Sequence, residues 1–525
     1  MNINMPNKTE DCQNSKLLED EASDADLQVV QTSNCKKIFF QVYVFILTFL
    51  TYAVLHLSRE AWSFLKEEVK EEQSPGIGLS SNDLGTIDMF FLFSYSIGLF
   101  ISGILGDKMN KNLLLGCGYL VAAGATVMVG LGGLWKIRSV WYYVGFFVIS
   151  GFAQSVGWPS VVAVMANWFP KKGRGFWFGV WTSNPNVGNI LGTLVSSLVN
   201  GVIGLSWGWT WIIVAIIVGT FGVINFIFMI EHPNKVGVVI QDELEEHDTM
   251  VLEHIDISRE HGEESMRRRD LTNDDEEEKQ PHERESQDVQ EELEAVQSHH
   301  EHKKFNFFRA WLIPGVIQYS ISYLALKLCN YGILLWLPTY VSEELDFSTS
   351  EKALVAILYD VGTIIGSVSL GLLSDMMYGK RVPVCFVGLL IATCLHSTLI
   401  FLGNNEKVII FIVIFILGFF IGSIANIISG TACADIGKHD SIKGNDSALS
   451  TVTGIVDGTG SLGAAAGQKG IGYIQDNANW TAVFIMMTSF VFISSVPISC
   501  IFVREIKEIF AIRKSTKEEK NVRSF

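Results

Sequence analysis

Apolar residues recur along this chain in long runs, each close to the length that crosses a lipid bilayer. Roughly 20 residues span the hydrocarbon core as an α-helix, and the runs at 38–57 and 210–230 approach that length. We predict twelve spans, at residues 38–57, 84–106, 112–134, 141–165, 176–203, 209–230, 310–341, 352–374, 382–402, 407–430, 448–474 and 479–502. The pattern therefore predicts an all-α membrane protein with twelve transmembrane helices.

One long polar stretch divides these spans into six and six. We accordingly predict two six-helix halves related by pseudo-two-fold symmetry. Glycine is abundant, at 47 residues, and many glycines fall inside the spans. Small residues let membrane helices approach closely, so this composition favours a packed bundle over isolated anchors.

Charge is concentrated in the polar stretch between the halves. Residues 241–304 hold 23 acidic and 8 basic side chains, close to −15 of the chain's net −16. The rest is nearly neutral, which gives no reason to expect a nucleic-acid partner. We therefore predict five regions: a disordered cytoplasmic tail 1–37, a six-helix half 38–230, an acidic disordered cytoplasmic loop 231–308, a six-helix half 309–502 and a cytoplasmic tail 503–525.

The distribution of lysine and arginine places both termini and the long loop in the cytoplasm. The first 37 residues are polar and acidic, unlike a cleavable signal peptide. Eight cysteines are scattered without metal or redox spacing. We therefore expect no metal, no cofactor and no catalytic centre, in a monomer whose partners are the lipid bilayer and a small solute.

Two features repeat at the same distance along the chain. Gly103–Asp107 and Gly371–Asp375 are matching Gly-x-x-x-Asp helix ends, 268 residues apart. Arg59 and Lys327 lie inside predicted spans and are also 268 residues apart. Ionisable groups within the membrane are default candidates for function. We therefore predict that each half presents one cation to a shared central cavity.

Two facing cations in a dry cavity repel each other and need an anion between them. A phosphate ester suits them, since it carries close to two negative charges and several acceptor oxygens. Arginine matches phosphate bidentately, and lysine adds a point charge. The alternative is that Arg59 reaches the membrane interface while Lys327 pairs with an acid such as Asp360. If the first interpretation holds, the empty site resists closing and obligatory exchange follows.

The acids and the other polar groups have two interpretations each. We expect Asp107 and Asp375 to act in structural gating at the inner loops. Asp88 and Asp360 either hold the cations in place or carry protons. Asp457, in a glycine-rich segment, either belongs to a phosphate-cradling loop or makes a tight helix contact, and the second is favoured because the strand–loop–helix context of a nucleotide loop is absent. His56 lies one turn before the arginine and either orients substrate or packs. Four aromatic residues either line a cavity or form an interface belt: Tyr52, Trp62, Tyr331 and Trp336.

Several motifs resemble the major facilitator superfamily, specifically its organophosphate/phosphate antiporters and, among these, the eukaryotic sugar-phosphate exchangers. The resemblance covers nearly all the chain except the N-terminal tail and the acidic loop. The motifs are Gln154-Ser-Val-Gly-Trp-Pro159, Asn167-Trp-Phe169, Ser183-Asn-Pro-Asn-Val-Gly-Asn-Ile-Leu-Gly192, Leu335-Trp-Leu-Pro-Thr-Tyr340, Ala434-Asp-Ile-Gly-Lys-His439, Ile442-Lys-Gly-Asn445, Ala448-Leu-Ser-Thr-Val-Thr453 and Asp457-Gly-Thr-Gly-Ser461.

The resemblance implies that Arg59 contacts phosphate and that Lys327 is the lysine of the eukaryotic exchangers. Asn330 occupies the position of a second arginine in the bacterial glycerol-3-phosphate exchanger. Trp158 and Asn186, in the shared motifs, complete the substrate-binding candidates. The chain departs from the bacterial pattern at Leu99 and Pro185, and from the usual lysine at Glu60. The resemblance favours the endoplasmic reticulum membrane.

The prediction is therefore a carrier that exchanges a phosphorylated sugar or glycerol phosphate for inorganic phosphate by alternating access. One alternative is a proton-coupled or facilitative carrier of another organic anion, working through Asp88 or Asp360. Another is a non-transporting membrane sensor whose acidic loop binds partners.

Overall fold

The structure is a computed structural model that describes residues 8–73, 76–106, 109–169, 177, 180–238, 310–402, 406–432 and 446–523. Every regular element in these residues is helical. The acidic stretch and the motif at 434–445 lie outside the described residues.

The first half contains helices that follow the predicted spans. Their bounds are α1 Lys8–Lys70, α2 Ser81–Gly106, α3 Lys111–Leu134, α4 Val140–Gln154, α5 Gly157–Trp168, α7 Asn184–Ser196 with the π-helical η1 Ser197–Val202, α8 Trp207–Phe228 and the 3₁₀ turn η2 Pro233–Val236. The predicted fourth span is two helices, α4 and α5, separated by a break at Ser155–Val156.

The second half repeats this organisation. Its bounds are α12 Val316–Glu343, α13 Thr349–Met376, α14 Val382–Thr398, α15 Lys407–Leu417, the π-helical η4 Gly418–Gly422, α16 Ser423–Asn426, the π-helical η5 Ile427–Ala432, α18 Asp446–Asn477 and α19 Trp480–Arg523. Proline stands inside α12 at Pro338 and inside α19 at Pro497.

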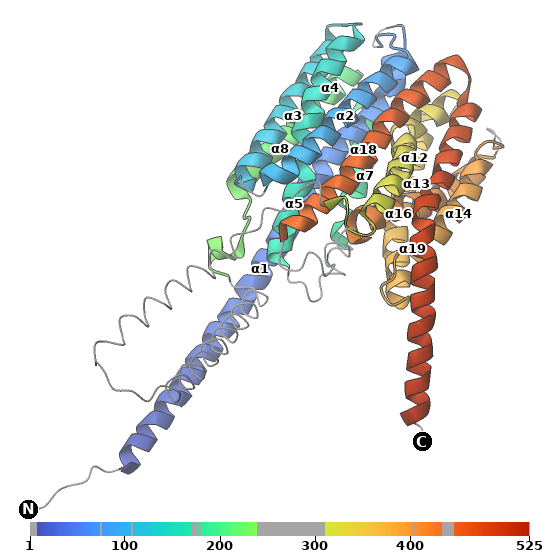
Figure 1. Ribbon diagram of the computed structural model, residues 1–525. Coiled ribbons are helices and arrows are strands. Elements are labelled where there is room, and N and C mark those ends of the chain that lie inside the picture. Colours follow the sequence, from blue (N-terminus) through green and yellow to red (C-terminus); the bar gives the residue numbers. More distant parts are fainter. Residues whose placement is uncertain are drawn as a thin grey trace, which may run out of the picture. The chain divides into compact units, whose positions relative to one another are not determined.

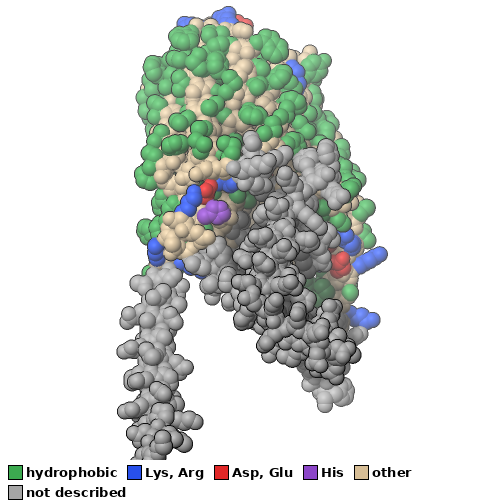
Figure 2. Space-filling model, turned by 60° about the vertical axis from the view of Figure 1, so that its left-hand side comes forward, with side chains coloured by type: hydrophobic (Ala, Val, Ile, Leu, Met, Phe, Trp, Pro, Cys, Tyr) green, Lys and Arg blue, Asp and Glu red, His purple; other side chains and the backbone are tan. Residues whose placement is uncertain are grey.

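Nine helical stretches of the described chain are long and apolar enough to cross a membrane. The other three predicted spans correspond to α7 with η1, to the shorter α14 and to the glycine-rich α18. Large apolar side chains such as Val121, Ile216 and Phe226 are half-exposed on the helix flanks. Figure 2 shows apolar side chains covering these flanks, with charged groups gathered toward the ends. Lipid is the environment that such a surface requires.

Some boundaries differ from the prediction. Residues 8–37 are the start of α1 rather than a disordered tail, and α19 continues to Arg523. No glycine or proline interrupts the chain between residues 8 and 70, so nothing in the sequence stops this helix. The first helix also extends beyond the predicted end at residue 57, as far as Lys70.

The described chain forms two compact units. The smaller contains residues 8–48, 164–169 and 230–238. Within it, Gln41 Nε2 donates to the carbonyl of Trp168 at 2.9 Å, and Trp168 Nε1 donates to the carbonyl of Ile230 at 2.8 Å. Trp168 thus ties three distant segments together, through its backbone carbonyl and its indole.

The larger unit contains the remaining helices and both halves of the sequence (Figure 1). Here α2 of the first half packs along α18 of the second, and α7 packs against α13. Close approach of α2 and α18 depends on small residues: a Cβ at Gly472 would lie 2.3 Å from the carbonyl oxygen of Ser81. Interhelical glycines therefore bring the two halves into direct contact, as the glycine content predicted.

Candidate substrate cavity

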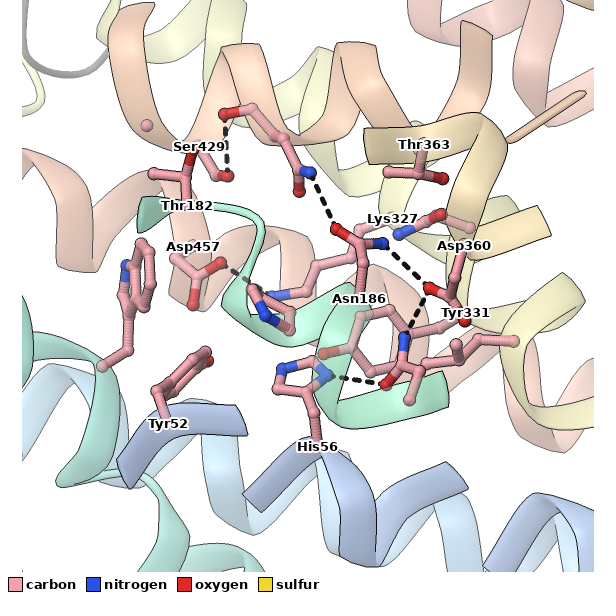
Figure 3. Close-up of a pocket in the computed structure, with 18 of the residues that line it drawn as sticks. Tyr52, His56, Thr182, Asn186, Lys327, Tyr331, Asp360, Thr363, Ser429 and Asp457 are labelled. Carbon is pink, nitrogen blue, oxygen red and sulfur yellow. Dashed lines mark hydrogen bonds and ion pairs between the residues drawn. The ribbon is translucent and has the colours of Figure 1, made fainter. Parts of the chain in front are cut away.

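A polar cavity of about 70 Å³ lies between helices of both halves in the larger unit. Helices α1, α7, α12, α13, α16 and α18 all contribute side chains to it. Polar and aromatic side chains line most of the cavity (Figure 3). They include Tyr52, His56, Trp158, Asn186, Asn189, Lys327, Asn330, Tyr331, Asp360, Asn426 and Asp457. Eight of these were predicted site residues: His56, Trp158, Asn186, Lys327, Asn330, Tyr331, Asp360 and Asp457. They come from spans far apart in the chain, except that Asn330 and Tyr331 are neighbours of Lys327.

Lys327 enters the cavity from α12 and is paired. Its Nζ lies 2.8 Å from Asp457 Oδ1 and 2.9 Å from Ser461 Oγ, both on α18. The lysine is only 3% exposed, so this is a buried ion pair. Figure 3 shows the carboxylate and the ammonium pointing toward each other. Lys327 therefore pairs with an acid, as the alternative interpretation expected, but the acid is Asp457 rather than Asp360. The expected role of Asp457 as a helix contact is thus incomplete.

Arg59 is buried in the C-terminal part of α1, and 4% of it is exposed. Its Nε donates to Gln154 Oε1 and its Nη1 to the hydroxyl of Tyr331, each at 3.1 Å. The guanidinium lies over the Tyr95 ring at 4.5 Å, and Nη2 meets no hydrogen-bond acceptor in the described part of the chain. Placement of Arg59 at the membrane interface is therefore wrong: the group is internal.

The two cations meet at Tyr331 rather than in one open chamber. Arg59 lines a second, smaller cavity, and Tyr331 lines both. The tyrosine hydroxyl accepts from the guanidinium, while its ring lies 5.4 Å from the Lys327 ammonium. Cation–π distances of this size are attractive. The predicted single cavity is thus two adjoining ones, because this phenol stands between them.

Asp360 on α13 occupies another part of the cavity. Its Oδ1 accepts from Asn186 Nδ2 at 2.8 Å and from Asn189 Nδ2 at 2.9 Å, both on α7. Asn189 Oδ1 in turn lies 3.1 Å from His56 Nδ1. Asp360 therefore does not hold either predicted cation. His56 belongs to this polar network and also packs against Tyr52, with ring centroids 5.2 Å apart.

Asp88 on α2 pairs with Lys66, a residue that the sequence analysis did not single out. The Lys66 ammonium also donates to the carbonyl of Leu335 at 3.0 Å, and Trp62 Nε1 donates to Asp88 Oδ1 at 2.9 Å. The lysine is fully buried. Asp88 thus fixes a contact between α1, α2 and α12, and the expectation that it holds Arg59 is wrong. Lys66 was missed because the first span was predicted to end before it.

The remaining candidates have separate surroundings. Asp375 is exposed and pairs with Arg381 at 2.7 Å, and Asp107 lies outside the described residues. Asn330 Oδ1 accepts from the hydroxyl of Tyr359 at 2.6 Å. Trp158 contacts Tyr52, with ring centroids 4.8 Å apart. Of these, the cavity contains Asn330 and Trp158, while Asp375 stands apart from it.

One side of the cavity is formed by a segment of irregular helix. The run from Gly418 to Ala432 alternates between π-helical and α-helical turns, and Gly422, Asn426, Ser429 and Gly430 all line the cavity. Wide turns of this kind often occur at functional sites. Sequence reasoning missed Asn426, Gln154 and Ser461, which are uncharged and give no signal in a hydropathy pattern.

Helices of lipid-facing character surround two adjoining internal cavities, lined by the buried cations Arg59 of the first half and Lys327 of the second, and these features define a polytopic membrane carrier. The sequence profile of the Major Facilitator Superfamily matches residues 40–443. The chain belongs to this superfamily and is an integral membrane protein.

Curated relatives extend along most of the chain. "Sugar phosphate exchanger 3" of Mus musculus is 36% identical over 497 residues, covering 89% of this chain and 93% of the relative. "Glucose-6-phosphate exchanger SLC37A2" of Xenopus laevis is 33% identical over 485 residues, covering 88% and 91%. These relatives are named as exchangers rather than enzymes.

A solved bacterial homologue of the human lysosomal transporter Spinster, titled as inward-facing and unoccupied, shares the fold. It is 16% identical, with a TM-score of 0.57, and the match covers 90% of this chain and 98% of that chain. The predicted twelve-helix fold and the predicted family are both confirmed.

Proposed function

We propose that the protein exchanges a phosphate ester, of the sugar-phosphate or glycerol-phosphate class, for inorganic phosphate by alternating access. The observation that carries the proposal is the buried Arg59 guanidinium. It has no carboxylate partner in the described chain, and Lys327 lies on the other side of the Tyr331 ring. The names of the relatives, sugar phosphate and glucose-6-phosphate exchangers, agree with this chemistry.

The phosphate binds where the two cations converge. A rotation of the Tyr331 side chain joins the two small cavities, so that one phosphate contacts the free Nη2 of Arg59 and the ammonium of Lys327. Charge-assisted hydrogen bonds to phosphate are about twice as strong as neutral ones. To reach the lysine, the anion displaces Asp457.

Exchange follows from the charge of the empty site. A buried cation without a counter-ion carries a large desolvation penalty. With Lys327 neutralised by Asp457, this penalty falls on Arg59. Phosphate or its ester supplies the missing negative charge, so the loaded carrier changes conformation more readily than the empty one. The predicted endoplasmic reticulum location and the monomeric state stay part of this proposal.

The test is uptake of labelled phosphate by liposomes that contain the purified full chain. We expect uptake to be much faster with phosphate inside than into empty liposomes, and phosphate esters to compete with labelled phosphate. Arg59→Ala removes at least two charge-assisted contacts of about 1.5–3 kcal/mol each, so exchange should fall at least about 100-fold. Arg138→Ala, at an exposed arginine outside the cavity, is the matched control. Equal uptake into phosphate-loaded and empty liposomes would contradict exchange.

A further inference from the structure

Asp360 is a buried carboxylate that faces the cavity without a cation. It is 2% exposed, and both amide donors that reach it bind the same oxygen, Oδ1. Within the described residues, no basic side chain pairs with Asp360, and no group donates to Oδ2. An ionised carboxylate has about four acceptor positions. At least two positions of Asp360 are therefore free for a donor within the cavity.

The donors and acceptors of the surrounding hydrogen-bond network are fixed, because the Asp360 carboxylate can only accept. Since Asp360 accepts, the Nδ2 groups of Asn186 and Asn189 must face it, and their carbonyl oxygens face away. Asn189 Oδ1 can only accept, so the 3.1 Å contact requires His56 to carry its proton on Nδ1. His56 Nε2 is then an acceptor on the cavity wall. Asn426 Nδ2 approaches Asn186 Oδ1 at 3.4 Å and completes the chain.

An aromatic face lines the same cavity. Trp158 contacts Tyr52 at 4.8 Å and stacks on Trp181 at 5.5 Å with an interplanar angle of 21°. Both neighbours are buried, which holds the indole in place. A flat aromatic surface beside a carboxylate, amides and an imidazole suits a molecule with C–H faces and several hydroxyl groups.

We propose that Asp360, with Asn186, Asn189 and His56, forms a subsite for the hydroxyl groups of the transported ester and thereby determines which esters are carried. The proposal rests on the proposed function. A carboxylate repels phosphate, so the phosphate lies toward Lys327 and the uncharged hydroxyl-bearing part lies toward Asp360. Inorganic phosphate has no such part and does not use this subsite.

The test compares two competitors of equal charge in the phosphate self-exchange assay: glycerol 3-phosphate and n-propyl phosphate. They differ only in two hydroxyl groups. We expect wild-type protein to bind glycerol phosphate at least about tenfold more tightly than propyl phosphate. Propyl phosphate would leave the buried acceptors of the subsite without a donor, and sites of this kind discriminate strongly against such an analogue. Asp360→Asn should remove most of this difference. Phosphate self-exchange should persist or strengthen, because a like charge has left the cavity.

The same substitution at Asp83, half-buried in the first turn of α2 and outside the cavity, is the matched control: Asp83→Asn should keep the wild-type ratio. Asn186→Ala, which leaves the carboxylate with one amide donor, is a second variant and should reduce the ratio in the same direction. The subsite is refuted if Asp360→Asn retains the full preference for glycerol phosphate, or weakens phosphate and both esters equally. Absence of phosphate self-exchange in the wild type would instead contradict the proposed function.

Discussion

Asp457→Asn is the most informative perturbation of the cavity, because it separates the internal counter-ion from the transported one. The substitution preserves shape but leaves the Lys327 ammonium with Ser461 alone. Removing one partner of a buried ion pair typically costs about 3–5 kcal/mol. The carboxylate side chain is 10% exposed and faces a polar cavity. We therefore expect destabilisation near the lower limit, about 3 kcal/mol.

The same change should strengthen phosphate binding. In the wild type, phosphate must displace the carboxylate that lies 2.8 Å from the lysine. Two unit charges 4 Å apart interact by about 4 kcal/mol at an effective dielectric constant of 20. In the variant, phosphate no longer has to break this attraction between Asp457 and Lys327. If one third of the energy is gained in phosphate binding, the gain is about 1.4 kcal/mol, or tenfold in affinity. We expect Asp457→Asn to bind phosphate about tenfold more tightly.

Thermal unfolding of the full chain in detergent, with and without phosphate, measures both effects. Without phosphate the variant should unfold at a lower temperature than the wild type, and saturating phosphate should narrow this gap. Ser461→Ala is the control, since it removes only the neutral partner of Lys327. It should lower stability slightly without a gain in phosphate affinity. The reasoning is refuted if phosphate raises the unfolding temperature of wild type and Asp457→Asn equally, or no longer protects the variant.

Three further predictions test contacts around the cavity. Tyr331→Phe removes an acceptor of the buried guanidinium, so without phosphate it should lower the free energy of unfolding by about 1.5–3 kcal/mol, and phosphate should protect the variant more than the wild type in thermal melts. Lys66→Met should lower the free energy of unfolding by about 3–5 kcal/mol, and Lys66→Met/Asp88→Asn should recover most of it, as measured by thermal melts. Gly362→Ala should destabilise the protein by more than 2 kcal/mol, because the new Cβ would lie 2.1 Å from a carbonyl of the neighbouring helix; Gly371→Ala, in the same helix with open space, should be neutral or stabilising.

The helical fold was predictable because a bilayer imposes one length and one polarity on every span. The same logic found Arg59 and Lys327, since a charge inside an apolar run is visible in sequence and an equal offset relates the two. Both cations are buried and both contact Tyr331, Arg59 at the hydroxyl and Lys327 at the ring.

The partners of these cations were not predictable in the same way. Asp457 lies 130 residues beyond Lys327, and no local pattern distinguishes it from Asp360 as the pairing acid. Choice between the two depends on which helix, α18 or α13, faces the lysine in the folded bundle. Hydropathy sets which residues are buried, but the packing of helices sets which buried residues meet.

Asp457 also changes the argument for exchange. With both cations unpaired, as the sequence suggested, the empty carrier would be strongly opposed to changing conformation. The structure neutralises Lys327 internally and leaves Arg59 as the cation that lacks a carboxylate partner among the described side chains. The barrier for the empty carrier is then lower than two free charges would give, and some net flux accompanies exchange. Asp457→Asn restores the second unpaired charge, so it should raise the ratio of phosphate efflux into phosphate-containing buffer to efflux into phosphate-free buffer. A lower ratio would mean that the carboxylate, rather than the arginine, is what opposes movement of the empty carrier.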